Sequence, residues 1–288
     1  MAADLATPAP DDLAEIVATL GRWQEDAAPV QLHPGDVGWF HRFGTEATAA
    51  ALRTWHRDGA LLAIGLLDGP GLLRLAVAPN GREDDDLARS VVTAATDPTV
   101  GVLPEGDAVV EEPPGRALRA QFGAAGWTSD EAWTPLRHSL TGLRPDPTVN
   151  VHEVGPDEAD AFAEVLRAAF EGSTSTADRW RALTEGPAWP DARCLLALDD
   201  GSPAATITVW SAGPGRPGLV EPLGVHRDHR GRGLGRAVTT AGLRVLEEMG
   251  AASATVCTPS ANMGAVATYV AAGFTPLTQM HDLRRPTA

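Results

Sequence analysis

Apolar residues along the chain recur at two spacings, one typical of helices and one typical of strands. Spacings of three and four predict long helices over residues 11–23, 84–95, 156–170 and 233–249. Paired apolar runs predict hairpins over 61–78 and 192–210, each with glycine in its turn. Further helices are predicted over 45–57, 116–124, 177–183 and 263–272, and further strands over 108–111, 127–140, 149–154, 219–225, 254–257 and 274–283. This order predicts an α/β protein with mixed, mostly antiparallel sheets flanked by helices.

The sequence contains an internal repeat. Three segments of the first half match three of the second half, in the same order and at a nearly constant offset: 75–80 with 223–228, 87–91 with 234–238, and 122–128 with 269–275. Between the halves lies Arg144-Pro-Asp-Pro147, in which two prolines resist both helix and sheet. We therefore expect two copies of one domain, a first lobe over 1–143 and a second over 149–288.

Composition and charge narrow the class of protein. The chain has 288 residues, 43% of them hydrophobic and 21% charged, as in soluble globular proteins. It contains no apolar run long enough to span a bilayer and no signal-peptide layout, so we expect a cytoplasmic protein. A net charge of −15 argues against nucleic acid or an anionic membrane as partner. The two cysteines lie far apart, which predicts buried thiols, and no metal-ligand spacing is present.

One stretch, residues 219–238, combines a strand, a glycine loop and a helix. Gly231, Gly233 and Gly235 let the backbone approach a ligand closely, and the following helix begins with unpaired N–H groups. Arginines at 230, 232 and 236 add positive charge, so the stretch predicts a pyrophosphate site, although a solvated glycine turn is the simpler alternative. In the first half, Glu83-Asp-Asp-Asp86 stands at the equivalent place and would repel a pyrophosphate. We therefore expect the first lobe to be structural or to shape the acceptor site.

Two motifs carry a family resemblance. The first is Arg230-Gly-Arg-Gly-Leu-Gly235 after the strand Glu221–Val225, and the second runs from Asn262 through Tyr269 to Gly273-Phe274. Together they resemble the GNAT superfamily of acyl-CoA-dependent N-acyltransferases, over about 149–283. With the degenerate first half, the chain resembles tandem GNAT proteins such as mycothiol synthases. The resemblance implies acetyl-CoA as cofactor and an amine acceptor, either a small molecule or a peptide.

The resemblance also implies roles for particular residues. Main-chain groups of Leu223, Gly224 and Val225 would pair with the pantetheine arm, where the strand splays from its neighbour at a bulge. The Val225 amide would polarise the thioester carbonyl, and Asn262 would steady the cofactor or the start of the last helix. Backbone amides would hold the CoA pyrophosphate, those of Arg230, Gly231, Arg232, Gly233, Leu234, Gly235 and Arg236.

Transfer to an amine needs a base for the ammonium proton and an acid for the departing thiolate. Tyr269, the one tyrosine in the chain, is the candidate acid; the alternative is a tyrosine packed on a helix face. Glu221 is the candidate base, directly or through water, and Pro222 beside it suggests an irregular strand. His226 and His229 are alternative bases in the turn that follows.

The sequence thus predicts acetyl-CoA-dependent N-acetylation of a primary amine, by direct attack in a ternary complex. Two alternatives remain open: mycothiol-synthase-like acetylation of a thiol glycoside's amine, and a non-catalytic acetyl-CoA sensor. Nucleotide-dependent enzymes are disfavoured because the glycines do not follow their motifs. We expect the acceptor pocket to be lined by residues 33–43 and 171–176 with Trp180 and Trp189. A monomer and a homodimer both fit the sequence.

Overall fold

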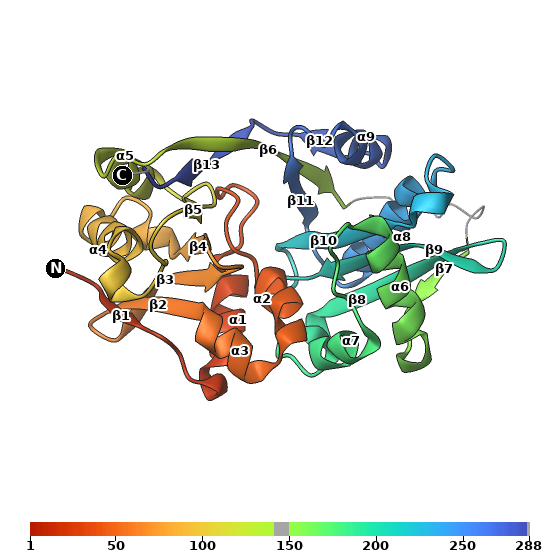
Figure 1. Cartoon of the computed structure of the whole chain (residues 1–288), viewed down its shortest axis with the longest axis horizontal. Helices are drawn as coiled ribbons and strands as arrows, with labels where there is room; N and C mark the ends of the chain where they lie inside the picture. Colours follow the sequence, from red (N-terminus) through yellow and green to blue (C-terminus); the bar gives the residue numbers. More distant parts are fainter. Residues whose placement is uncertain (141–149, 287–288) are drawn as a thin grey trace.

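The structure, a computed structural model, describes residues 1–140 and 150–286. The chain forms two α/β lobes that lie side by side (Figure 1). The fold class predicted from the sequence is therefore confirmed, whereas the predicted linker Arg144–Pro147 lies outside the described residues. Within those residues, no helix is both long and apolar enough to cross a membrane.

The first lobe is a sheet covered by helices on both faces. Its strands are β1 (Asp4–Ala6), β2 (Leu52–Arg57), β3 (Ala60–Leu67), β4 (Leu72–Val77) and β5 (Val109–Val110). Its helices are α1 (Leu13–Trp23), α2 (Pro34–Phe40), α3 (Thr45–Ala51), α4 (Asp85–Thr96) and α5 (Arg116–Ala124). Buried side chains of α4 and α5 pack on one face, and those of α1, α2 and α3 pack on the other.

The second lobe repeats this plan. Its strands are β7 (Asn150–Glu153), β8 (Ala192–Asp199), β9 (Ser202–Trp210), β10 (Pro217–Val225), β11 (Ser253–Pro259) and β12 (Thr275–Pro276). Its helices are α6 (Ala159–Ala169), α7 (Ala177–Thr184), α8 (Leu234–Glu248) and α9 (Met263–Ala271). Here α8 and α9 cover one face of the sheet, and α6 and α7 cover the other.

The two lobes exchange their last strands. β6 (Thr128–Ser139) follows the first lobe's α5, yet it pairs with β11 of the second lobe from Ser139 to Trp133. β13 (Met280–Arg284), at the end of the chain, pairs with β5 of the first lobe and with β6. Figure 1 shows β6 bridging the lobes and β13 lying beside β5. One sheet thus runs through both lobes in the order β1-β2-β3-β4-β5-β13-β6-β11-β10-β9-β8-β7.

The internal repeat is visible in the structure. In the first lobe β4 leads through the 3₁₀ turn Pro79–Gly81 into α4. In the second lobe β10 leads through the 3₁₀ turn Arg227–His229 into α8. The matched sequence segments therefore occupy matched positions, which confirms the tandem arrangement.

Two predicted elements are wrong in part. The helix expected over 45–57 ends at Ala51, and Leu52–Arg57 is instead strand β2. Here pairing with β3 and burial of Trp55, which is 0% exposed, outweigh the helical spacing. The single strand expected over 274–283 is divided into β12 and β13. β12 pairs with β6 on the edge opposite β11, and β13 pairs farther along β6 and with β5 of the first lobe.

Helix α2 was not predicted at all. It begins at Pro34 behind a local cap, in which the His33 amide donates to Asp36 Oδ2 at 2.6 Å and the Gly35 amide donates to His33 Nδ1 at 2.9 Å. Its Gly35 and Gly38 lie against the indole of Trp210, where a Cβ would come within 2.5 and 2.4 Å of ring atoms. α2 is therefore seated directly on the second lobe.

Candidate active site

Strand β10 departs from regular pairing at Glu221. Val220 pairs with Val209 and Leu223 with Ile207, so β10 carries one extra residue relative to β9. The Glu221–Pro222 peptide is cis. The indole N–H of Trp210 donates to the Glu221 carbonyl at 2.8 Å. On its other side, β10 pairs in parallel with β11 only from Pro217 to Leu219. The irregular, splayed strand expected from the sequence is therefore present.

The open part of β10 presents unpaired main-chain groups to that side. The His226 amide donates to the Ala204 carbonyl at 2.8 Å. Because successive N–H groups of a strand point to opposite edges, the Val225 N–H points away from β9. The residues predicted to receive an acyl-pantetheine arm, Leu223 to Val225, thus offer it a strand edge.

A cavity of about 370 Å³ lies where this edge faces the first lobe. We call it the interlobe cavity. The second lobe contributes Glu221, Leu223, Asn262 and Tyr269 to its wall, so both predicted catalytic residues share one cavity. The first lobe and β13 contribute the opposite wall, which includes His33, Asp36, Asp68, Arg74, Glu111 and Asp282.

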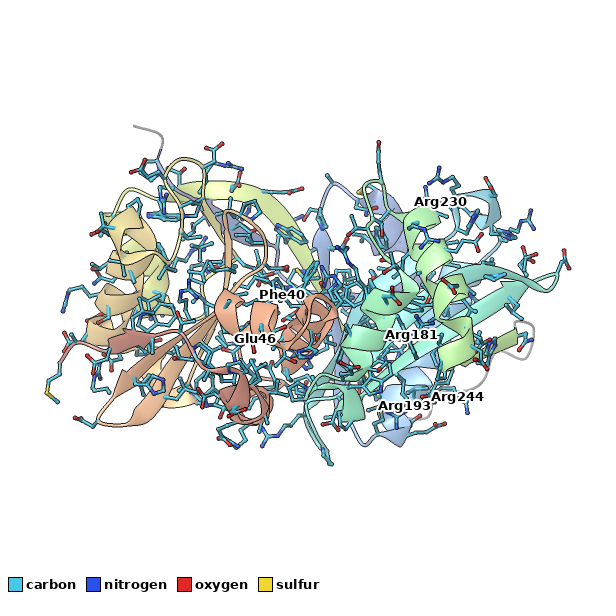
Figure 2. The ribbon with its side chains drawn as sticks, turned by 60° about the horizontal axis from the view of Figure 1, so that its bottom comes forward. Phe40, Glu46, Arg181, Arg193, Arg230 and Arg244 are labelled. Carbon is cyan, nitrogen blue, oxygen red and sulfur yellow. The ribbon has the colours of Figure 1, made fainter. Side chains whose placement is uncertain are left out.

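The glycine loop and α8 fit a pyrophosphate through their backbone. Gly231 and Gly233 both have φ of +78°, and a Cβ built at either would meet open space. α8 begins after Gly233 without a side-chain cap, so its first amides face outward. The Arg230 side chain instead donates to the Ala169 carbonyl at 2.8 Å, and Arg232 pairs with Asp199 at 2.7 Å. Figure 2 shows Arg230 on the second lobe, away from Phe40 near the centre of the molecule.

The equivalent place in the first lobe is closed. Asp84 caps α4, since its Oδ1 accepts the Leu87 amide at 2.9 Å, and its other oxygen pairs with Arg57 at 2.5 Å. These hydrogen bonds, that of Arg57 first, lower the pKa of Asp84 and keep it charged. Strand β4 also pairs with β3 without a register shift. The first lobe therefore has neither the open helix end nor the bulge.

Tyr269 and Asn262 lie on α9, opposite the bulge. Tyr269 is 6% exposed and stacks edge-on against Phe274, with ring centroids 5.6 Å apart. Burial, together with the nearby Glu221 carboxylate, raises the pKa of Tyr269, so its hydroxyl keeps a proton that it can donate. Asn262 Oδ1 accepts the Ala265 amide at 3.1 Å and so caps α9.

Arg74 of β4 joins the two walls of the cavity. Its side chain is 14% exposed and faces four carboxylates, with nitrogen–oxygen distances of 3.0 Å to Asp36, 3.1 Å to Glu111, 3.4 Å to Asp68 and 3.7 Å to Glu221. Although burial opposes its charge, the carboxylates, Asp36 first, raise the pKa of Arg74. A first-lobe guanidinium thus lies beside the predicted catalytic base of the second lobe.

Sequence reasoning found only part of the first-lobe side of this cavity: the predicted stretch 33–43 supplies two of its residues, but Arg74, Glu111 and Asp282 were missed. A usable signal was present, because Arg74 is the one charged residue in the apolar strand Leu72–Val77. Asp282 gave a weaker signal, as an acidic residue in the last strand of the chain, β13. No local pattern pointed to Glu111 as their neighbour.

Several predicted pocket residues lie elsewhere. His226 and His229 are not in the cavity wall, and His229 Nδ1 instead lies 2.7 Å from Asp199. Trp180 and Trp189 pack edge-on in the core around α6 and α7, with centroids 5.7 Å apart. Residues 171–175 border a separate, more open pocket with Trp39 and Arg42. Of the stretch 33–43, only His33 and Asp36 reach the interlobe cavity.

The two α/β halves share one design. Only the second keeps an open strand edge followed by a helix without a side-chain cap, since α4 is capped and α8 is not. These features define a tandem acyltransferase architecture. The family model described as "Acetyltransferase (GNAT) family" matches residues 159–274. A mycothiol acetyltransferase of Actinosynnema mirum is 30% identical, over 92% of this chain and 93% of that protein. One of Nocardia farcinica is 30% identical, over 73% of this chain and 72% of that protein.

Solved structures show the same fold. A tandem GNAT protein from the clavulanic acid biosynthesis pathway superposes with a TM-score of 0.64 at 17% identity, covering 99% of this chain and 100% of that chain. A GCN5-related N-acetyltransferase from Sphaerobacter thermophilus gives a TM-score of 0.59 at 19% identity, covering 98% and 95%. The chain belongs to the GNAT family of acetyltransferases. It is an N-acetyltransferase of that family, whose members generally use acetyl-CoA.

Proposed function

We propose that the chain uses acetyl-CoA to acetylate a primary amine of a small molecule at one active site, formed by the second lobe and completed by the first. The bulge at Glu221 is the observation that carries this proposal. It opens the edge of β10 and places a carboxylate in the cavity reached by that edge. The glycine loop and α8 lie at the end of the same strand, in the order that a phosphate-ended cofactor needs.

Each part of the second lobe has a role in this proposal. The backbone from Gly231 to the first turn of α8 binds the pyrophosphate, and main-chain groups of Leu223 to Val225 pair with the pantetheine arm. Acetyl-CoA supplies an electrophilic thioester, and the outward-pointing Val225 amide donates a hydrogen bond to its carbonyl oxygen. Asn262 acts on the site indirectly, because it caps the helix that bears Tyr269.

The proton transfers follow from the positions of Glu221 and Tyr269. Glu221 takes a proton from the acceptor's ammonium group, directly or through water, which frees the nitrogen lone pair for attack. A nitrogen–carbon bond then forms as the carbon–sulfur bond breaks. Tyr269 donates its proton to the departing CoA thiolate, the acylated nitrogen loses its second proton to water, and the Tyr269 hydroxyl is reprotonated from solvent. The products are an acetamide and CoA.

The two alternatives can be weighed on the structure. An acceptor like that named for the mycothiol acetyltransferases is consistent with the homology, but nothing in the cavity favours it over other amines. A non-catalytic acetyl-CoA sensor would need the glycine loop but would have no use for a carboxylate and a tyrosine in one cavity. Glu221 and Tyr269 both line this cavity. The N-acetyltransferase therefore accounts for more of the site.

Turnover with a panel of amines tests the proposed function. Purified protein, acetyl-CoA and single primary amines are incubated, CoA thiol is followed colorimetrically, and the acetylated product is identified by mass spectrometry. We expect at least one small primary amine to release thiol in step with acetamide formation. Thiol release no faster than in amine-free controls, across small amines, peptides and cysteinyl glycosides, would contradict the proposal.

A further inference from the structure

The interlobe cavity carries a large excess of negative charge. Its wall contains six carboxylates, but only two guanidinium groups: Glu25, Asp36, Asp68, Glu111, Glu221 and Asp282 against Arg74 and Arg137. Arg137 pairs at 4.0 Å with Asp26, a carboxylate that is not part of this wall. Among the described residues, no cluster has the arrangement of a metal site. A cationic ligand bound here would balance negative charge that the two guanidinium groups leave uncompensated.

Arg74 alone cannot balance the carboxylates around it. One positive charge is shared by four carboxylates, and the nearest of them still has hydrogen-bonding capacity. Asp36 is 4% exposed and lines the cavity, and its Oδ1 accepts no hydrogen bond from the described residues, although it lies 3.0 Å from Arg74. Burial raises the pKa of Asp36 despite the attraction of Arg74. A further cation would stabilise the charged form of a buried carboxylate that has an oxygen without a hydrogen bond.

Among the described residues, no cation pairs with Asp282, whereas the nearby Glu111 pairs with Arg74 at 3.1 Å. Asp282 is 6% exposed, and its Oδ1 accepts the Glu112 amide at 3.1 Å. The charged groups that act on it are Glu111 and Asp130, and Asp130 already pairs with Arg284 at 2.7 Å. Burial and then the Glu111 carboxylate raise the pKa of Asp282 to about 7. The described residues thus bring Glu111 and Asp282 together without a positive charge on Asp282.

The reacting amine cannot supply the missing charge. Its nitrogen must lose a proton before it attacks the thioester, so it is neutral when the reaction occurs. Only a cationic group that does not react can stay bound to the carboxylates throughout. This reasoning rests on the proposed function of the cavity and adds the chemical class of its acceptor.

We propose that the acceptor is a small amine with a second cationic group: one amine reacts at Glu221, while the other cation binds the Glu111 and Asp282 carboxylates. The first lobe and its exchanged strand β13 supply this second subsite. They thereby select the substrate for a reaction carried out by the second lobe.

Matched acceptors test this proposal. Initial rates with acetyl-CoA are measured for α,ω-diamines of three to six carbons, for the monoamines of equal length and for the corresponding amino alcohols. We expect kcat/KM for the best diamine to exceed that of its monoamine and amino alcohol by about 10- to 100-fold, as for a buried charge pair. If monoamines or amino alcohols are acetylated as well as diamines, the proposal is wrong, while the proposed N-acetyltransferase function stands.

Variants locate the subsite. Glu111→Gln and Asp282→Asn keep the shape of the side chain, and each should lower the diamine-to-monoamine ratio about tenfold. Glu83→Gln, an exposed carboxylate of the same lobe, serves as the control and should leave the ratio unchanged. A ratio that does not fall in Glu111→Gln and Asp282→Asn overturns the proposal.

If no amine is acetylated, the proposed function fails. Calorimetric binding of 1,4-diaminobutane and butylamine to the CoA complex then decides the subsite: equal affinities overturn it, and a diamine preference that falls in Glu111→Gln supports it.

Discussion

Glu221→Gln is expected to lower kcat/KM about 100- to 10,000-fold while acetyl-CoA binding stays close to that of the native protein. The variant keeps the side-chain shape and the bulge, whose carbonyl is held by the Trp210 indole, and it removes only the group that accepts the ammonium proton. Steady-state rates over a range of amine concentrations, together with calorimetric titration of acetyl-CoA, check both parts. Raising the pH should recover part of the lost rate, because the amine then arrives unprotonated more often.

Two further variants serve for comparison, one as a control and one as a test of the proposed acid. Glu164→Gln removes an exposed carboxylate on α6 and should leave the rate unchanged. Tyr269→Phe should slow turnover only about tenfold, since a thiol of pKa ~8.5 leaves without strong assistance. If Glu221→Gln turns over at the native rate across pH, Glu221 has no part in the proton transfer.

Arg74→Met is expected to lower the free energy of unfolding by about 3–5 kcal/mol. The change leaves Asp36, Asp68, Glu111 and Glu221 without the one guanidinium they share, and Asp36 and Glu111 lose contacts at 3.0 and 3.1 Å. Removing one partner of a buried ion pair is costly because the remaining charge is uncompensated. Urea unfolding at pH 8, followed by circular dichroism, gives the measurement.

The loss in Arg74→Met should depend on pH. Burial already raises the Asp36 pKa, so its carboxyl costs stability as pH rises from the ordinary value near 3.8 through the folded value. Without Arg74 this cost grows, and the deficit should be larger at pH 8 than at pH 5. Arg89→Met, which removes an exposed pair with Asp86, is the control and should change stability little at either pH. The account would be contradicted if Arg74→Met lost little free energy of unfolding at either pH, or if the loss were larger at pH 5 than at pH 8.

Sequence reasoning predicted most of the fold and the second-lobe residues that line the interlobe cavity. Local sequence signals are strong in the second lobe. They are the glycines at the start of α8, the proline after Glu221 and the single tyrosine, and each lies in a segment whose structure follows from its own sequence. The errors arose where pairing with a distant segment determines the secondary structure. Leu52–Arg57 has helical spacing, but it forms a strand because β3 is available to pair with it.

The first-lobe half of the site depends on long-range packing that no local pattern encodes. Asp36 reaches the cavity because α2 lies on Trp210 through two glycines and because His33 Nε2 lies 3.1 Å from the Pro217 carbonyl. Asp282 reaches it because β13 crosses to pair with β5. These contacts join residues far apart in the chain. The acidic stretch at 83–86 therefore predicted that the first lobe lacks a pyrophosphate site and is structural or shapes the acceptor site. Outside the stretch 33–43, it did not predict which first-lobe residues line the cavity.

The number of CoA molecules bound per chain tests the central claim, that the second lobe holds one cofactor site and the first lobe holds none. In calorimetric titration the native protein should bind one CoA. Gly233→Asp, which places a carboxylate at the α8 amino end as Asp84 does at α4, should abolish binding. Gly233→Asn, whose side chain also tolerates the left-handed conformation, should retain it. Two molecules per chain, or undiminished binding by Gly233→Asp, would contradict the account.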